Sequence, residues 1–207
     1  MRSMYTPKAF AVDELQECIQ FVRKESFGIL FAPVGGKPFA THLPMLLSED
    51  GGTLLGHIAT ANPQWRHLDG AEVLAVFHGP HSYISPTWYE QPVDAPTWNY
   101  IAVHVYGRCR IVADLEELHA ILRETLRFYE PESPLLADER LLRRMAEGAT
   151  GYVVEVSSIE GKAKGSQNKT IATRLSVIEH LRRSSDARAR ATADWMERLL
   201  PQEYRNG

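Results

Sequence analysis

The stretch GHIATANPQWR, residues 56–66, carries residue types that suit an anionic group. The apolar residues 53–60 predict a strand. Asn62 followed by Pro63 predicts a short helix over residues 62–68, since Asn is a preferred cap and Pro a preferred first helical residue. A helix start presents free N–H groups and the positive end of the helix dipole, which suit a phosphate. The polar side chains beside it are those of Thr60, Gln64 and Arg66. An ordinary strand-to-helix joint with an exposed arginine explains the same residues.

Three further clusters combine polar and aromatic side chains near the ends of predicted strands. In ATHLP, residues 40–44, side-chain alternation along a strand sends Thr41 and His42 to opposite faces. The other two clusters consist of Trp98, Asn99 and Tyr100 in PTWNYIAVH, and of Lys164, Ser166, Gln167, Asn168 and Lys169 in KGSQNK. Core packing of aromatics and a loop entering a helix explain each cluster singly. Together they supply cations, amide donors and flat aromatic surfaces, which suit a planar, phosphorylated ligand.

The sequence lacks the common motifs of nucleotide, zinc and nucleophile sites. It contains no GxxxxGK[ST] loop, no GxGxxG after a predicted strand, no HExxH and no GxSxG. His78 and His81 are separated by Gly-Pro, which predicts a turn, whereas His42, His57 and His104 lie in separate predicted strands. We therefore expect no metal site, and the catalytic residues, if any, stay unknown.

The composition is that of a soluble globular protein. The 207 residues are 44% hydrophobic and 24% charged, with a formal net charge of −3 and a pI of about 6.2. This balance argues against a protein that grips DNA through its phosphates. Cys18 and Cys109 form no CxxC pair and read as small apolar residues in a reducing compartment. With no spanning apolar run and no signal peptide, we expect a cytoplasmic protein without membrane contact.

Hydrophobic periodicity predicts the elements that must position these clusters. Strands are expected over residues 26–33, 37–47, 53–60, 71–79, 81–89, 97–112 and 151–159, and helices over 13–24, 62–68, 114–130, 138–148 and 170–200, the last broken near Ser184. The glycine pairs in VGGK and SEDGG predict hairpin turns. Asp114 with Glu117 reads as a capping box. The expected buried faces are Leu15, Cys18, Ile19 and Val22 in the first helix, and Leu118, Ile121, Leu122 and Tyr129 in the helix after Asp114.

Strands joined mostly by hairpins, with helices at the ends and not between successive strands, predict an antiparallel β-barrel decorated by helices. We place this mainly β, α+β domain at residues 1–165, with helices inserted at about 114–148. Residues 166–207 are expected to form a C-terminal helical extension that packs on the barrel.

Several blocks of the sequence closely resemble the PaiB family, which is described as FMN-binding negative transcriptional regulators. The blocks are MYTPKAF (4–10), ATHLP (40–44), GHIATANPQWR (56–66), GPHSYISPTWY (79–89), PTWNYIAVHVYG (96–107) and SQN (166–168). They occur in order up to about residue 170, and the helices beyond resemble the family less distinctly.

The resemblance implies a Greek-key, FMN-binding split barrel related to pyridoxamine-phosphate oxidases and flavin reductases, forming a homodimer with FMN at the subunit interface. It implies that Thr60, Asn62, Gln64 and Arg66 hold the FMN phosphate, and that the strand of Thr41, His42 and Leu43 runs alongside the isoalloxazine. The residues implied to close the pocket, from the same or the partner subunit, are Trp98, Asn99, Tyr100, Lys164, Ser166, Gln167 and Asn168.

Three functions stay open on the sequence. The first is a flavoprotein with oxidoreductase or flavin reductase-like activity. The second is a transcriptional regulator that acts on DNA directly or through metabolism or a partner, for which the basic helical residues are Arg182, Arg183, Arg188 and Arg190. The third is a haem-binding split barrel with an axial histidine from His42, His57, His78, His81 or His104.

Overall fold

The computed structural model describes residues 4–89 and 95–205. They form two compact units. The first unit comprises the described residues of Met1–Asp13, His78–Ala102 and Gly161–Gly207, and the second comprises Glu14–Phe77 and Val103–Glu160. The predicted domain boundary after residue 165 stays a prediction.

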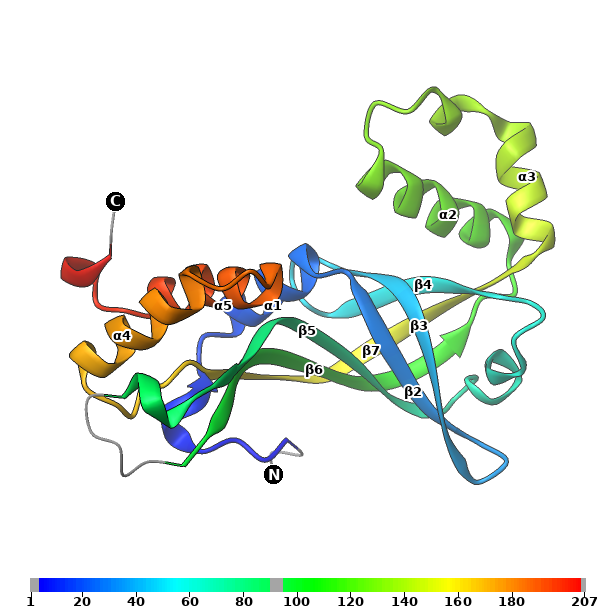
Figure 1. Cartoon of the computed structure of the whole chain (residues 1–207). Helices are drawn as coiled ribbons and strands as arrows, with labels where there is room; N and C mark the ends of the chain where they lie inside the picture. Colours follow the sequence, from blue (N-terminus) through cyan, green and yellow to red (C-terminus); the bar gives the residue numbers. More distant parts are fainter. Residues whose placement is uncertain (1–3, 90–94, 206–207) are drawn as a thin grey trace. The chain divides into compact units, whose positions relative to one another are not determined.

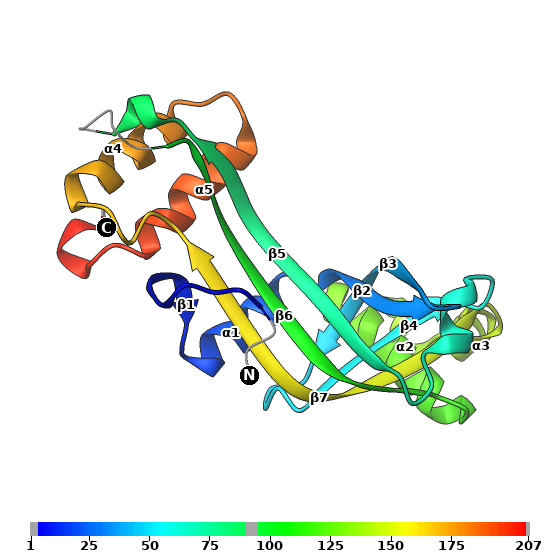
Figure 2. The same cartoon turned by 90° about the horizontal axis from the view of Figure 1, so that it is seen from below.

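Within the described residues, seven strands form one sheet in the order β1-β7-β4-β3-β2-β5-β6, and β6 also pairs with β7. The strands are β1 (Ala11–Val12), β2 (Phe27–Val34), β3 (Lys37–Leu47), β4 (Thr53–Ala59), β5 (Glu72–Ile84), β6 (Thr97–Ile111) and β7 (Ala149–Lys164). The pairs with a defined register are antiparallel. Figures 1 and 2 show β5, β6 and β7 running side by side. The predicted antiparallel sheet with helices is confirmed as an α+β architecture, although helix and strand contents are roughly equal and the fold is not mainly β.

Glycines make the hairpin turns, as predicted. Gly35 and Gly36, between β2 and β3, have φ of 58° and 76°, and Gly51, between β3 and β4, has φ of 75°. These left-handed conformations are open to glycine at little cost. The turns set a register in which Leu30 faces Thr41 across β2 and β3.

The inward faces of the strands make the core of the second unit. Leu30, Met45, Leu54 and Phe77 are all fully buried. A second apolar cluster lies between the sheet and the helix pair α2 (Leu115–Tyr129) and α3 (Glu139–Glu147), and its buried members are Val112, Leu118, Ile121, Leu122 and Leu142. The remaining helix of this unit is α1 (Leu15–Lys24), which buries Cys18, Ile19 and Val22.

In the first unit, α4 (Ile171–Arg182) and α5 (Ala187–Arg198) pack against each other and against the end of β5 (Figure 1). The buried members of this cluster are Ile84, Tyr89, Val177, Ile178, Leu181, Ala189, Ala193, Met196 and Leu200. No helix among the described residues is long and apolar enough to cross a bilayer.

The structure corrects four local predictions. His78-Gly79-Pro80-His81 is not a turn, because β5 runs through it as one strand and merges the two strands expected there. Leu15 and Tyr129, expected in buried helix faces, are 54% and 49% exposed. The capping box at Asp114 is half formed, since Asp114 accepts from the Glu117 N–H while the Glu117 carboxylate pairs with Arg110.

The strands β6 and β7 approach each other closely at Gly107. A Cβ atom at this position would overlap the main-chain oxygen of Glu155 and lie 2.7 Å from a methyl group of Val154. Only a residue without a side chain lets the two strands pair here and close the sheet.

We expect Gly107→Ala to lower the free energy of unfolding by about 2–3 kcal/mol, since a main-chain atom cannot move aside as a side chain can. Urea unfolding followed by circular dichroism measures the change. Gly148→Ala is the matched control, because a Cβ at Gly148 meets nothing within 4 Å. Equal stability of the two variants would show that β6 and β7 do not pack this tightly.

Candidate functional site

The turn after β4 is built as the sequence predicts, except that its helix is a short 3-10 helix, Pro63–His67. Asn62 caps it, accepting the Gln64 N–H at its Oδ1 atom over 3.0 Å, and Pro63 occupies the first helical position. A helix this short adds little dipole, so any anion here depends on side chains.

Gln64 lies at the centre of a buried hydrogen-bond network and is fully buried. Its Oε1 atom accepts from the Thr41 hydroxyl over 2.5 Å, and its Nε2 donates to the Leu30 carbonyl over 3.2 Å. The Thr41 hydroxyl in turn accepts from Asn62 Nδ2 over 3.0 Å. The three predicted ligand contacts Thr41, Asn62 and Gln64 therefore join the turn to β3 and β2, and their side chains position this region.

Arg66 is the cation that this turn presents to solvent. Its guanidinium lies 5.0 Å from the centre of the Trp65 ring, and the Trp65 indole N–H donates to the Thr60 carbonyl over 2.9 Å. Arg66 has no carboxylate partner among the residues that the structure describes. The exposed Thr60 hydroxyl lies 3.3 Å from that of Thr150. The sequence analysis did not assign Trp65 to the site, although its position between Gln64 and Arg66 indicates that it could contact the arginine.

Along β3, the predicted alternation is confirmed. Leu43 is buried, Thr41 is half-buried on the same side, and His42 is exposed on the other side. A flat ligand lying against one face of β3 would therefore meet either His42 or its two neighbours.

The first unit contains a pocket of about 240 Å³ lined by four of the predicted residues. These are Asn99, Lys164, Ser166 and Asn168, and the other polar or aromatic lining residues are Thr97, Lys169, Tyr89 and Phe10. Gln167 does not line it but folds the loop, accepting from the Gly165 N–H at 2.7 Å and donating to the Ala163 carbonyl at 2.6 Å.

Trp98 and Tyr100 line a separate, open hollow with His78 and His81, since alternation along β6 sends them away from Asn99. Trp98 is 53% exposed and lies 6.3 Å from the His81 ring, centre to centre. His81 Nδ1 lies 3.1 Å from the Gly79 carbonyl oxygen. Because a carbonyl can only accept, Nδ1 donates, which leaves Nε2 of the neutral ring as an acceptor.

The structure therefore places the predicted site residues in both units. Thr41, His42, Leu43, Thr60, Asn62, Gln64 and Arg66 belong to the second, and Trp98, Asn99, Tyr100, Lys164, Ser166, Gln167 and Asn168 to the first. A joint role of the two sets in one flavin site stays a prediction.

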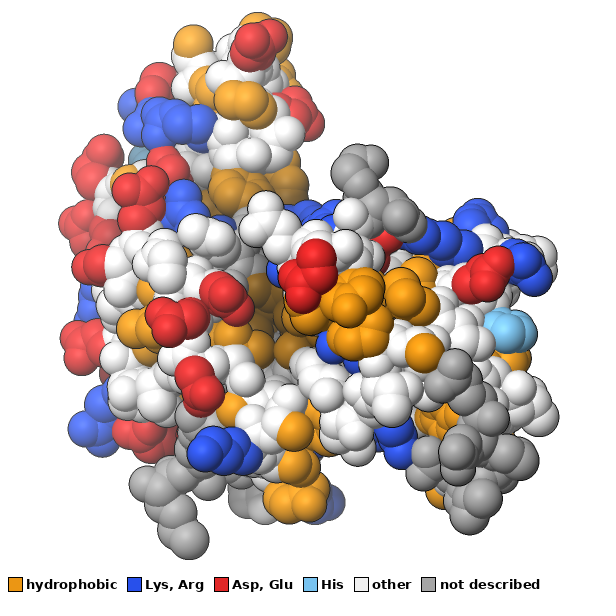
Figure 3. All heavy atoms as spheres, turned by 90° about the vertical axis from the view of Figure 1, so that its left-hand side faces the viewer, with side chains coloured by type: hydrophobic (Ala, Val, Ile, Leu, Met, Phe, Trp, Pro, Cys, Tyr) orange, Lys and Arg blue, Asp and Glu red, His pale blue; other side chains and the backbone are white. Residues whose placement is uncertain are grey.

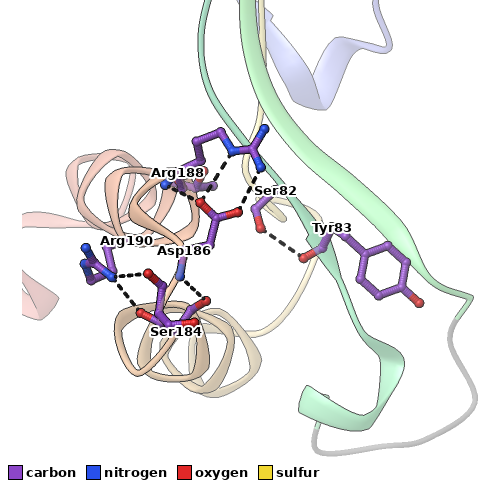
Figure 4. Close-up of polar contacts among 8 residues, drawn as sticks. Ser82, Tyr83, Ser184, Asp186, Arg188 and Arg190 are labelled. Atoms are coloured by element: carbon purple, nitrogen blue, oxygen red, sulfur yellow. Dashed lines mark hydrogen bonds and ion pairs between the residues drawn. The ribbon is translucent and has the colours of Figure 1, made fainter.

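The four arginines of the basic C-terminal run have partners within their own helix pair. Arg182 pairs with Glu197, and Arg183 pairs with Glu179. Figure 4 shows the other two at the start of α5, where Arg188 pairs with Asp186 and Arg190 donates to the carbonyls of Ser184 and Ser185 in the turn after α4. On the face drawn in Figure 3, basic side chains are interspersed with carboxylates. The helices α4 and α5 therefore form a solvent-exposed pair whose four arginines are engaged with carboxylates or main-chain oxygens of the same pair.

A family model described as "Putative FMN-binding domain" matches residues 4–158. The chain belongs to this family. It is also 38% identical over 208 residues to "Protease synthase and sporulation protein PAI 2" of Bacillus subtilis (strain 168), a match that covers 97% of this chain and 100% of the relative. The resemblance to the PaiB family is confirmed, and the family's cofactor is FMN.

Solved structures of the family's fold are similar at low sequence identity. The FAD and heme binding protein from Mycobacterium smegmatis aligns with a TM-score of 0.62 and 12% identity, over 80% of this chain and 78% of that one. The flavocytochrome Anf3 from Azotobacter vinelandii aligns with a TM-score of 0.58 and 14% identity, over 75% and 69%. These similarities show that the chain has the split-barrel fold of flavin-binding proteins.

We expect Gln64→Leu to lower the free energy of unfolding by roughly 1–3 kcal/mol, because it leaves buried polar partners of the amide unpaired. Thermal and urea unfolding measure the change. Thr41→Ser keeps a hydroxyl for the same bonds and serves as the control, with a much smaller expected loss. If Gln64→Leu is as stable as the unmodified protein, the network does not hold the turn.

Proposed function

We propose that this protein is an FMN-binding flavoprotein that holds the FMN phosphate at the turn after β4. The observation that carries the proposal is Arg66, an exposed guanidinium stacked on Trp65 with no carboxylate partner among the described residues. Arginine suits phosphate because its planar donors bind oxyanions in pairs. The donors of this turn fit a phosphate monoester: the Arg66 guanidinium has no acidic partner among the described residues, the Thr60 hydroxyl is exposed, and buried hydrogen bonds keep the turn in place.

Each residue of the turn would have a different task. Arg66 would neutralise the phosphate, Thr60 would donate its hydroxyl hydrogen, and Trp65 would keep the guanidinium in position. Gln64 and Asn62 would act through the turn, since their side-chain groups are engaged with protein atoms. When bound, FMN supplies one- and two-electron redox chemistry. Flavin reductase-like activity follows as a proposal without an assigned substrate.

We expect the unmodified protein to bind FMN more tightly than riboflavin, because only FMN carries the phosphate. Arg66→Ala should weaken FMN binding roughly tenfold or more and leave riboflavin binding unchanged, since a charge-assisted contact is lost. Quenching of flavin fluorescence during titration measures both affinities.

Arg143→Ala is the matched control, because Arg143 is an exposed arginine on α3 outside the turn. Loss of FMN and riboflavin affinity together in Arg66→Ala would indicate damage to the fold. Unchanged preference for FMN over riboflavin in that variant would remove Arg66 from the phosphate site.

A homodimer is the second part of the proposal. The second unit carries an apolar groove of about 430 Å³, and its large apolar members are Phe31, Phe39, Leu74 and Tyr106. Apolar surface of this kind marks interfaces. The PaiB resemblance favours a second copy as its occupant, with the first unit's predicted residues closing the flavin site from the same or the partner subunit.

We expect Phe39→Glu to convert a dimer into a monomer, because it buries a charge in the groove that a second copy would cover. Sedimentation velocity at micromolar concentration measures the mass. Phe128→Glu, at a 40% exposed phenylalanine on α2, should leave the mass unchanged. A monomeric unmodified protein, or a dimeric Phe39→Glu variant, would contradict the proposed interface.

Haem binding is a second candidate, favoured by His81. Donation from Nδ1 to a carbonyl leaves Nε2 as the ligand atom, which is the usual arrangement of a metal-binding histidine. The hollow beside it offers the Trp98 and Tyr100 rings to a flat ligand. The absorption spectrum separates the candidates, since only haem gives an intense band near the edge of the visible range.

A regulatory role, as the family description has it, is proposed to act through flavin or a partner protein. Direct DNA contact by α4 and α5 would first have to break the ion pairs of their arginines. Salt-sensitive binding of duplex DNA would support direct regulation.

A further inference from the structure

The end of β7 carries two lysines without a carboxylate partner among the described residues. Lys162 is 8% exposed, and its Nζ donates to the Tyr5 carbonyl over 3.0 Å and lies over the rings of Tyr5 and Tyr100. Lys164, two residues on, donates to the Thr97 hydroxyl and lines the pocket of the first unit. Positive charge held in partly buried surroundings is costly unless an anion compensates it.

The loop after Lys164 contains main-chain donors without a partner in the described part of the chain, and its residues Ser166 and Asn168 line the same pocket. The N–H groups of Ser166, Gln167 and Asn168 have no hydrogen-bond partner among the described residues. Ser166 is 4% exposed and has φ of 63°, the one non-glycine left-handed residue in the described chain. Successive N–H groups in a turn with a left-handed residue form the concave nests that bind anions.

Buried side chains hold this loop in its unusual conformation. Asn99 is fully buried and donates to the Ser166 hydroxyl over 2.9 Å, while Gln167 bonds to main-chain atoms on both sides of the loop's start. A left-handed non-glycine residue costs free energy and persists only where its surroundings impose it, which occurs most often at functional sites. The loop is therefore shaped before any ligand arrives.

We infer that this pocket binds an oxyanion, the phosphate or carboxylate group of a small molecule, through the N–H groups of Ser166 and Asn168 and the Lys164 ammonium. The pocket of about 240 Å³ has room for roughly eight waters, which is enough for a phosphate with a small organic group. The inference does not require FMN at Arg66, because all of its residues belong to the first unit.

The pKa of Lys164 is lowered in the protein without a ligand. Burial lowers its pKa, and the neighbouring positive charge of Lys162 lowers it further, against an opposing effect of Tyr100. A bound oxyanion would favour the charged amine.

The test is a titration of the full-length, isotope-labelled protein with inorganic phosphate, followed by amide NMR. We expect saturable shifts of the Ser166 and Asn168 amides, and a roughly tenfold weaker affinity in Lys164→Met. Lys37→Met, at an exposed lysine of the β2–β3 hairpin, should bind as the unmodified protein does.

Two controls keep the inference open to failure. Sodium chloride at matched ionic strength should not shift the loop amides. Ser166→Gly keeps every N–H group and removes the left-handed strain, so it should still bind phosphate. Absence of phosphate-specific shifts, or equal affinity in Lys164→Met and Lys37→Met, would overturn the site.

Competition identifies the source of the oxyanion, and both of its outcomes support the pocket. Displacement of phosphate from the loop by FMN but not by riboflavin would identify the flavin phosphate as the occupant. Phosphate that stays bound at saturating FMN would identify a separate phosphorylated or carboxylated ligand. Failure of FMN binding, with phosphate still bound, would contradict the proposed flavoprotein and leave this site standing.

Discussion

The contact between β6 and β7 at Gly107 is the constraint on which the rest of the second unit depends. It lets the last strand of the sheet pair with β7, so the edge that β6 would otherwise expose is covered. A closed sheet encloses an interior, and the side chains of Leu30, Met45 and Phe77 fill it. Polar side chains that could meet a ligand are then left to the strand ends, the turns and the outer face.

Both candidate sites combine a buried amide side chain with a cation that has no acidic partner among the described residues. Gln64 ties the turn of Arg66 to β2 and β3, and Asn99 holds Ser166 beside Lys164. A buried amide with its hydrogen bonds made is costly to disturb, so it keeps nearby charged groups in place.

The family membership and the local chemistry agree on an anionic ligand but not on DNA. The arginines of α4 and α5 that would have to bind a DNA duplex are paired with carboxylates or main-chain oxygens. Arg66 and Lys164, in contrast, have no acidic partner among the described residues. Unpaired cations beside a shaped turn suit a small phosphate better than an extended backbone.

The sequence by itself determined the hairpin glycines, the Asn62 cap, the alternation along β3 and the family, because these depend on neighbouring residues or on whole blocks of sequence. Tertiary structure alone decided that β5 runs through Gly79-Pro80, since the pairing of long strands outweighs a local turn preference. It also decided that Gln64 is buried, because its partners Thr41 and Leu30 are distant in sequence. The left-handed conformation of Ser166 likewise depends on Asn99, which is distant in sequence. Burial and hydrogen-bond partners are set by packing between distant segments, which no local pattern encodes.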